Sequence, residues 1–186
     1  ETTEAQATLE EIEDTLPQDI ETALMLAEGY LLLVGNAERA SHHAARALQW
    51  LEEEGEVPPE TLSRAHSLMS RALLHTNDVL GAFGAWKLSP LPDWRVAVEL
   101  IEAGYDPQRV LEILRAALPE HRAFEAAGGA DSKASADRIE RLIAWIEAGR
   151  PAARENNTAY TDVQRASRRD AHDQLAAHDP RVRDRP

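Results

Sequence analysis

The histidines are the residues whose type best suits metal binding, so their spacing is the first feature to consider. Two of them, His42 and His43, are adjacent. Neighbouring residues on a helix point about 100° apart, so this pair cannot readily share one metal ion. Helical ligand pairs are separated by three or four residues, and no histidine pair of this chain has that spacing. The sequence therefore predicts no metal site.

Patterns typical of catalysis are also missing. The chain contains no cysteine and no GxxxxGK[ST], GxGxxG or GxSxG motif, so thiol chemistry, phosphate loops and nucleophile elbows are unsupported. Serine, histidine and aspartate are present, but no spacing singles out a triad. These observations predict a non-catalytic protein without a cofactor. A helical enzyme whose site forms only in three dimensions remains an alternative.

Two further groups of residues could contact a partner. The acidic run 52–54 with Glu56 lies at a predicted helix end, where it opposes the helix dipole. It is interpreted either as a solvated linker or as a contact for a basic partner. The tryptophans are expected to fill junctions between helices, and Trp94 is the one chosen as an exposed binding anchor. The four are Trp50, Trp86, Trp94 and Trp145.

The charge is strongly acidic and unevenly distributed. The 186 residues carry a net charge of −13, of which residues 1–149 contribute −15 and residues 150–186 contribute +2. Binding of nucleic acid through phosphates requires a basic face, so the composition argues against a nucleic-acid partner. An acidic surface favours either basic partners or simple solubility.

Composition gives only a weak indication of the cellular compartment. No apolar run reaches the roughly 20 residues of a membrane helix, so no membrane span is predicted. The chain begins at Glu1 rather than Met, and no signal peptide is visible. A cytoplasmic location is favoured, and a periplasmic one stays open if an upstream signal was removed. Arginine outnumbers lysine and alanine is abundant, which suggests a GC-rich bacterial genome.

The elements that must position these residues are almost all helices. Alternation of β-branched residues is absent and only 5% of residues are aromatic, so a sheet is not expected. Predicted helices cover about 4–16, a segment ending at Val34, 38–54, 60–75, a short segment from Asn77 or Asp78 to the break at 89–92, 93–103, 107 to the glycines at 128–129, 132–148 and 158–177.

Local signals place the helix ends. Gly35 and Gly104 are suited to left-handed stops, and Pro59 and Pro107 are suited to first helical turns. Residues 55–59 read as a linker. Three helices are expected to be capped by side chains that accept backbone hydrogen bonds; the capping residues are Asn77 or Asp78, Asp93, and Asp106.

The alanines at Ala40, Ala44 and Ala47 share one helical face and allow another helix to approach closely. With the apolar segment before Gly35 they form a helix hairpin. This hairpin resembles a tetratricopeptide repeat, a unit of about 34 residues. The residues that match its first helix are Leu24, Ala27 and Leu31, and a second hairpin matches at Ala65, Leu68, Ala72, Gly81, Ala85 and Leu88, followed by Pro90.

The resemblance covers residues 20–90 and implies an all-α fold of stacked antiparallel helix hairpins in a right-handed solenoid. The expected organisation is an acidic N-terminal helix (1–16), TPR-like hairpins (17–127), a further hairpin or capping helices (132–177) and a disordered tail (178–186). The turns fall at Gly35, Thr76, Gly104 and Gly149, spaced by 41, 28 and 45 residues, so the period is irregular.

The resemblance also implies a function as a protein-binding scaffold or adaptor. Family members bind a peptide or helix in a groove lined by the first helices. The lysine and asparagine residues with which some members bind a C-terminal carboxylate are missing here. The expected partner is therefore a hydrophobic peptide or an amphipathic helix, with basic partners steered by the acidic edges. The groove-lining residues would be Met25, Gly29, Leu32, His66, Ser70, Leu73 and Trp94.

Three other interpretations stay open. The predicted groove residues could pack against the chain's own N-terminal or C-terminal helix. The chain could be a regulatory or sensor domain of a larger bacterial protein. It could also be a self-associating assembly factor that forms homo-oligomers, because the end faces of helical stacks need covering.

Overall fold

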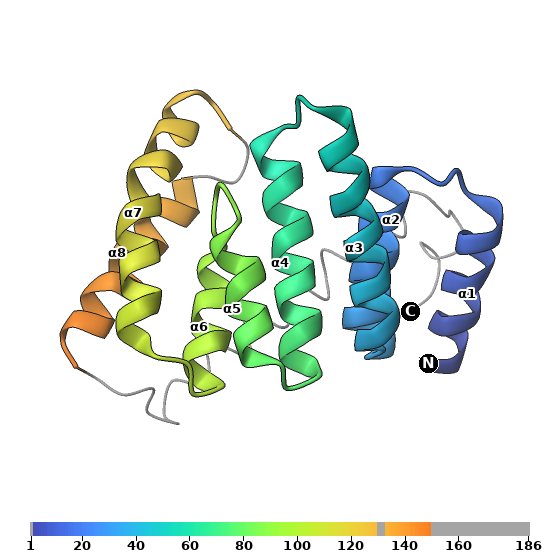
Figure 1. The fold of residues 1–186 in the computed structure, drawn as a ribbon, viewed down its shortest axis with the longest axis horizontal. Coiled ribbons are helices and arrows are strands. Elements are labelled where there is room, and N and C mark those ends of the chain that lie inside the picture. The colour runs from blue at the N-terminus through green and yellow to red at the C-terminus, as the bar shows by residue number, and fades with distance from the viewer. Residues whose placement is uncertain (1, 130–132, 150–186) are drawn as a thin grey trace. The chain divides into compact units, whose positions relative to one another are not determined.

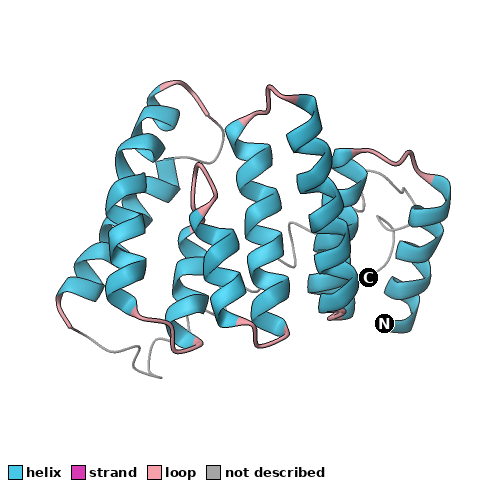
Figure 2. Ribbon diagram, viewed as in Figure 1, coloured by secondary structure: helices cyan, strands magenta, loops and turns pink. Residues whose placement is uncertain are grey.

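The computed structural model describes residues 2–129 and 133–149, and these contain helices and no strand (Figures 1 and 2). The predicted all-α fold class is confirmed. The elements are α1 (Thr2–Thr15), α2 (Ile20–Gly29), the π-helical segment η1 (Tyr30–Val34), α3 (Ala37–Glu54), α4 (Pro59–His75), α5 (Val79–Lys87), α6 (Trp94–Glu102), α7 (Pro107–Ala126) and α8 (Lys133–Glu147).

The chain divides into two compact units, each described here by itself. Unit 1 ends at Val57 and unit 2 begins at Pro58. The boundary falls inside the predicted linker 55–59. That segment is indeed non-helical up to Pro58, and Pro59 occupies the first turn of α4 as expected. The predicted helix 158–177 and the predicted tail 178–186 lie outside the described residues.

Most predicted helix ends are confirmed because they depend on local chemistry. Gly35 and Gly104 adopt left-handed backbone conformations, with φ of 75° and 88°. The carboxylate of Asp78 accepts a hydrogen bond of 2.9 Å from the backbone N–H of Gly81. Asp93 and Asp106 cap α6 and α7 in the same way.

Unit 1 consists of α2 and α3, which run antiparallel (Figure 1), with α1 packed against α2 and η1. The inner stripe of α3 is buried and contains the predicted alanines Ala40, Ala44 and Ala47. Helix α1 approaches α2 closely at Gly29. A Cβ placed on Gly29 would lie 2.6 Å from Cδ2 of the fully buried Leu9, so only glycine fits without displacement of Leu9.

The π-helical segment η1 was not predicted from the sequence. Its wider turn is closed by a hydrogen bond from the N–H of Gly35 to the carbonyl of Tyr30. The Tyr30 side chain is fully buried. Its hydroxyl nevertheless both donates and accepts a hydrogen bond. It donates to Oε2 of Glu13 at 3.1 Å and accepts from Nη1 of Arg39 at 2.6 Å. This polar cluster joins α1, η1 and α3.

His43 completes the cluster. Its side chain is only 2% exposed, its ring stacks on Tyr30 at a centroid distance of 5.5 Å, and its Nε2 lies 3.5 Å from Oε1 of Glu13. Burial lowers the pKa of His43, although the charge of Glu13 acts in the opposite direction. Because its pKa is lowered from 6.5, His43 is neutral at pH 7. Burial also raises the pKa of Tyr30.

Unit 2 is built around a buried core centred on Trp86, which has no exposed surface. Helix α4 packs on α5, and α7 packs on α8. The ion pairs Arg115–Glu147 and Arg122–Glu140 join α7 to α8. The short helix α6 contacts α4, α5, α7 and α8. Helices α6 and α7, consecutive in the chain, thus pair less extensively than α7 pairs with α8.

The segment between α5 and α6 is held in place by side chains of other elements. The indole Nε1 of Trp86 donates to the carbonyl of Asp93 at 2.9 Å. The hydroxyl of Ser63 accepts from the N–H of Leu91 at 3.0 Å. His121 of α7 lies 3.2 Å from the carbonyl of Pro92, and burial lowers the pKa of His121. The bonds of Ser63 and His121 satisfy backbone groups of the segment between the helices, and that of Trp86 adds a second donor to the carbonyl of Asp93, which also accepts from the N–H of Ala97.

A nearly buried ion pair links α4 to α6. Arg71 donates to Glu99 through Nε at 3.2 Å and Nη2 at 2.8 Å. Burial raises the pKa of Glu99 despite the opposite effect of Arg71.

In the part of the chain that the structure describes, no helix has both the length and the hydropathy that a membrane crossing requires.

We expect Gly29→Ala to destabilise unit 1, because the added methyl group displaces Leu9. The expected loss in the free energy of unfolding is about 1–3 kcal/mol, measured by denaturant unfolding. The matched control is Gly84→Ala in α5, where a Cβ would meet no atom within 4 Å. This control should gain up to about 1 kcal/mol. Equal stabilisation by both substitutions would contradict close packing of α1 on α2.

We expect Glu99→Ala to cost about 3 kcal/mol, because it leaves the charge of Arg71 buried without its carboxylate partner. The double variant Arg71→Met, Glu99→Leu should recover most of this loss, because it removes both charges. Chemical denaturation of the three proteins at one pH measures the difference. A double variant as unstable as the single one would show that the pair itself, rather than the stranded charge, stabilises unit 2.

His43 predicts a pH dependence of stability. Its pKa is lower in the folded than in the unfolded protein, so the unfolded state takes up the proton first as pH falls. Its contribution to stability is complete above pH 6.5 and is lost as pH falls through the folded pKa. The slope from this one proton is at most about 1.4 kcal/mol per pH unit.

The measurement compares urea unfolding at pH 7.5 and 5.5 for the wild type, His43→Gln and the exposed neighbour His42→Gln. We expect a smaller stability difference between the two pH values in His43→Gln and an unchanged difference in His42→Gln. The interpretation is wrong if all three proteins lose the same stability on acidification.

Candidate functional site

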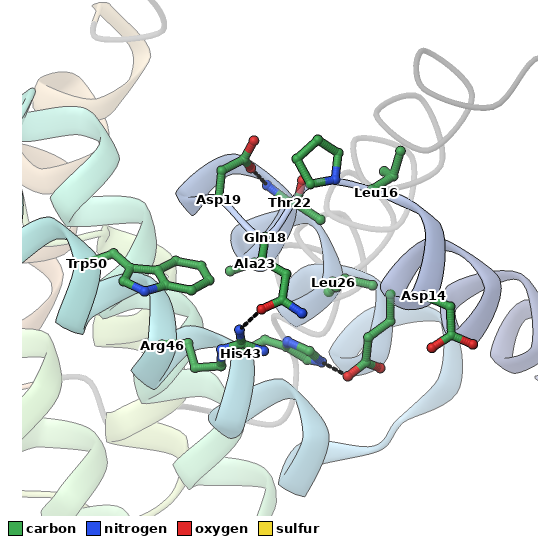
Figure 3. A pocket seen from close by; sticks show the side chains of 12 residues that line it. Asp14, Leu16, Gln18, Asp19, Thr22, Ala23, Leu26, His43, Arg46 and Trp50 are labelled. Carbon is green, nitrogen blue, oxygen red and sulfur yellow. Dashed lines mark hydrogen bonds and ion pairs between the residues drawn. The ribbon is translucent and has the colours of Figure 1, made fainter.

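Unit 1 contains a pocket of about 180 Å³ between the end of α1, the α1–α2 loop, α2 and α3 (Figure 3). It combines carboxylates, one arginine and an aromatic ring. The lining residues are Glu13, Asp14, Leu16, Pro17, Gln18, Asp19, Thr22, Ala23, Leu26, His43, Arg46 and Trp50.

The α3 side of the pocket is preorganised by Arg46. Its Nη2 donates to Oε1 of Gln18 at 2.8 Å, and its guanidinium lies 4.8 Å from the centre of the Trp50 ring. Figure 3 shows Gln18 extending from the loop to Arg46, with the half-buried Trp50 ring beside them. The loop and α3 are thereby fixed relative to each other, which holds the pocket open between them.

The α1 side of the pocket is acidic. Glu13 is engaged with Tyr30 and His43, whereas the exposed Asp14 makes no hydrogen bond or ion pair with the other described residues. Asp19 accepts from the N–H of Thr22 as the cap of α2. Because His43 is neutral at pH 7, Arg46 is the positive charge among these lining residues. The chemistry favours non-covalent binding of a cation.

A second feature lies on α5 in unit 2. Among the described residues, the exposed large hydrophobic side chains are Leu80, at 77%, and Leu88, at 65%. Gly84 lies between them, four residues from each, so the three share one side of the helix. We call Leu80, Gly84, Lys87 and Leu88 the α5 face. It is an apolar stripe with a low centre, suited to contact with another helix.

The residues predicted to line a groove do not form one accessible surface. In unit 1, Met25 and Gly29 are buried, Gly29 directly beneath Leu9 of α1, and Leu32 is half-buried. Gly29 packs against the chain's own N-terminal helix α1, which is one of the alternatives that the sequence left open. The physical reason is that α1 covers the side of α2 on which the groove was expected.

The other four predicted residues lie in unit 2. Ser70 is buried, and its hydroxyl donates to the backbone carbonyl of His66. The residue His66 is half-buried. Leu73 is partly buried against the core of the unit. Trp94 is also partly buried there, with the guanidinium of Arg138 4.8 Å from its ring centre. It therefore packs against α8 as well as offering some surface.

Sequence reasoning missed the residues of both candidate sites. Trp50 was assigned to a junction, although its spacing of four from Arg46 places the two on one helix face. The exposure of Leu80 and Leu88 had no such signal, because a helix as apolar as α5 is expected to be buried on all sides. The pocket itself had no local signal, since it depends on how α1 meets α3.

The predicted absence of a metal site stays a prediction. Across residues 2–129 and 133–149, no three or more His, Asp or Glu side chains come together in a way that could hold a metal ion. His42 is exposed while His43 faces Tyr30, with the two histidine rings edge to face at 5.4 Å.

Comparison with known proteins adds no assignment. Neither a protein-family model, nor a curated protein, nor a solved structure matches this chain. The resemblance to tetratricopeptide repeats therefore rests on the sequence pattern alone, and function has to be argued from the two candidate sites.

Proposed function

We propose that the chain is a non-catalytic protein-interaction module that binds an amphipathic helix of a partner on the α5 face. The observation that carries this proposal is the exposure of Leu80 and Leu88 on one side of α5. Other large hydrophobic side chains of the described residues are at least partly covered. A pair of leucines left in water costs free energy that contact with a partner recovers, about 1.5–3 kcal/mol for each side chain fully buried.

The geometry of the α5 face favours a helix over an extended peptide. Leu80 and Leu88 are eight residues apart, which corresponds to about 12 Å along a helix axis. Gly84 between them carries no side chain and meets no neighbour, so a partner helix can approach the backbone there. Apolar residues at every third or fourth position of that partner would contact both leucines.

The proposal keeps the predicted class of function but moves its site. The groove of first helices gives way to a face of α5, which is the second helix of its hairpin. A second copy of this chain is a competing occupant, as expected for a self-associating assembly factor. A regulatory domain of a larger protein would use the same face for a helix of that protein.

The test uses a designed peptide that forms an amphipathic helix with leucine at every third or fourth position. We expect the full chain to bind this peptide. The double variant Leu80→Glu, Leu88→Glu should weaken binding at least tenfold, because losing contact with the two leucines removes more than about 1.4 kcal/mol, which is what a tenfold change in affinity requires. The matched control is Ala116→Glu, Ala123→Glu on α7, which adds the same charge at exposed positions of the same unit. Fluorescence anisotropy of a labelled peptide measures the affinities.

Two results would contradict the proposal. Absence of binding to the wild type, or an equal loss in both double variants, would exclude a specific site on α5. Light scattering at two protein concentrations identifies the competing occupant. A wild-type dimer that Leu80→Glu, Leu88→Glu converts to a monomer would assign the face to a second copy instead.

A further inference from the structure

The acidic charge of the chain is concentrated in unit 1. Residues 1–57 contain 14 Asp and Glu residues, two arginines and no lysine, a net charge of −12, whereas the whole chain carries −13. Such an excess repels itself and attracts cations over a distance set by the ionic strength.

The two arginines of residues 1–57 already contact other residues of that segment. The Nη1 atom of Arg39 lies 2.6 Å from the hydroxyl of Tyr30, 3.4 Å from Oε1 of Glu10 and 3.6 Å from Oε2 of Glu13. Arg46 is held by Gln18 and Trp50 at the pocket. Neither is available to neutralise the outer carboxylates of residues 1–57. Further positive charge is carried by residues outside that segment, including the six arginines of residues 156–186.

The pocket is where this charge meets a cavity and an aromatic wall. We infer that the unit 1 pocket binds one cationic side chain, an arginine or a lysine, of a basic peptide segment in a partner protein. Asp14 supplies a carboxylate that has no hydrogen-bond or ion-pair partner among the described residues, Glu13 a second one, and Trp50 the aromatic surface. This site does not rest on the α5 face, which lies in the other unit.

The volume selects the kind of ligand. Pockets for drug-sized molecules measure about 300–1,000 Å³, whereas this one measures about 180 Å³. At about 30 Å³ per water molecule, it holds roughly six waters, which is space for one long side chain. The rest of a peptide would run along the acidic surface outside.

The walls select a cation over an anion. Arg39, outside the lining, is the ion-pair partner of Glu13, which leaves the carboxylates of Asp14 and Asp19 against the charge of Arg46. The neutral state of His43 at pH 7 adds no positive charge. An arginine guanidinium is favoured over a lysine ammonium, because it can bond two carboxylate oxygens at once and stack on an indole ring. Arg46 already occupies part of Trp50, which shows that the ring accepts a guanidinium.

The experiment titrates a blocked tetra-arginine peptide into the full chain at low ionic strength, with tetra-glutamate as the negative probe. We expect binding of the first peptide alone. Asp14→Asn should weaken it by up to about fivefold, the upper end of the range for an exposed ion pair. Trp50→Leu should weaken it by a similar factor, because it removes the cation–π contact.

The matched control separates the pocket from the general acidic field. Glu54→Gln removes the same charge from the same unit at an exposed position at the end of α3. Under the inference this variant binds the peptide as the wild type does. If Glu54→Gln and Asp14→Asn weaken binding equally while Trp50→Leu has no effect, only the overall charge attracts the peptide and the inference is overturned.

A third variant tests whether the chain supplies the cation itself. The C-terminal segment contains Arg181, Arg183 and Arg185. If their joint replacement by Gln converts a non-binding wild type into a binding protein, the pocket takes an arginine of its own chain, and the assignment to a partner is overturned. An unchanged affinity supports the partner. The leucines of α5 are intact in all these proteins, so failure here leaves the α5 proposal untouched.

Discussion

Close packing of helices at alanine and glycine is the constraint on which both units depend. The inner stripe of α3 buries alanines rather than large side chains, and Gly29 lets Leu9 of α1 rest directly on α2. Unit 2 follows the same rule with buried alanines on α4, α5 and α6; they are Ala65, Ala72, Ala82 and Ala97. Short side chains bring helix backbones close, so dispersion contacts are gained along the whole helix length. Few aromatic residues are needed to fill such a core.

This tight packing leaves little room for polar groups, and those that enter are held by several partners at once. Tyr30 is bonded to Glu13 and Arg39 and stacked on His43, while Arg71 and Glu99 meet through two hydrogen bonds. Each arrangement fixes the relation between helices that apolar contact alone would allow to slide. The Tyr30 cluster also forms the wall of the unit 1 pocket through Glu13 and His43. A structural device and a candidate binding site thus share the same side chains.

The two candidate sites differ in what they offer a partner. The α5 face is dominated by two exposed leucines, and its contribution is apolar area removed from water. The unit 1 pocket is small, acidic and preorganised by Arg46 and Gln18, and its contribution is charge and shape for a single side chain. Both features underlie the proposal that the chain interacts with other proteins.

The sequence by itself determined the helices and their ends, because caps, left-handed glycines and first-turn prolines act within a few residues of chain. Asp78, Asp93, Gly35 and Pro59 are correctly placed for that reason. Only the tertiary structure decided which helix faces are covered. Met25 and Gly29 of the expected groove are both buried, Gly29 beneath Leu9 of α1. The π-helical turn at Tyr30 has no local sequence signal. The pocket exists because α1, α2 and α3 meet around the α1–α2 loop. Periodicity identifies an apolar face, but it cannot tell which neighbour will cover it, since that depends on contacts between residues far apart in the chain.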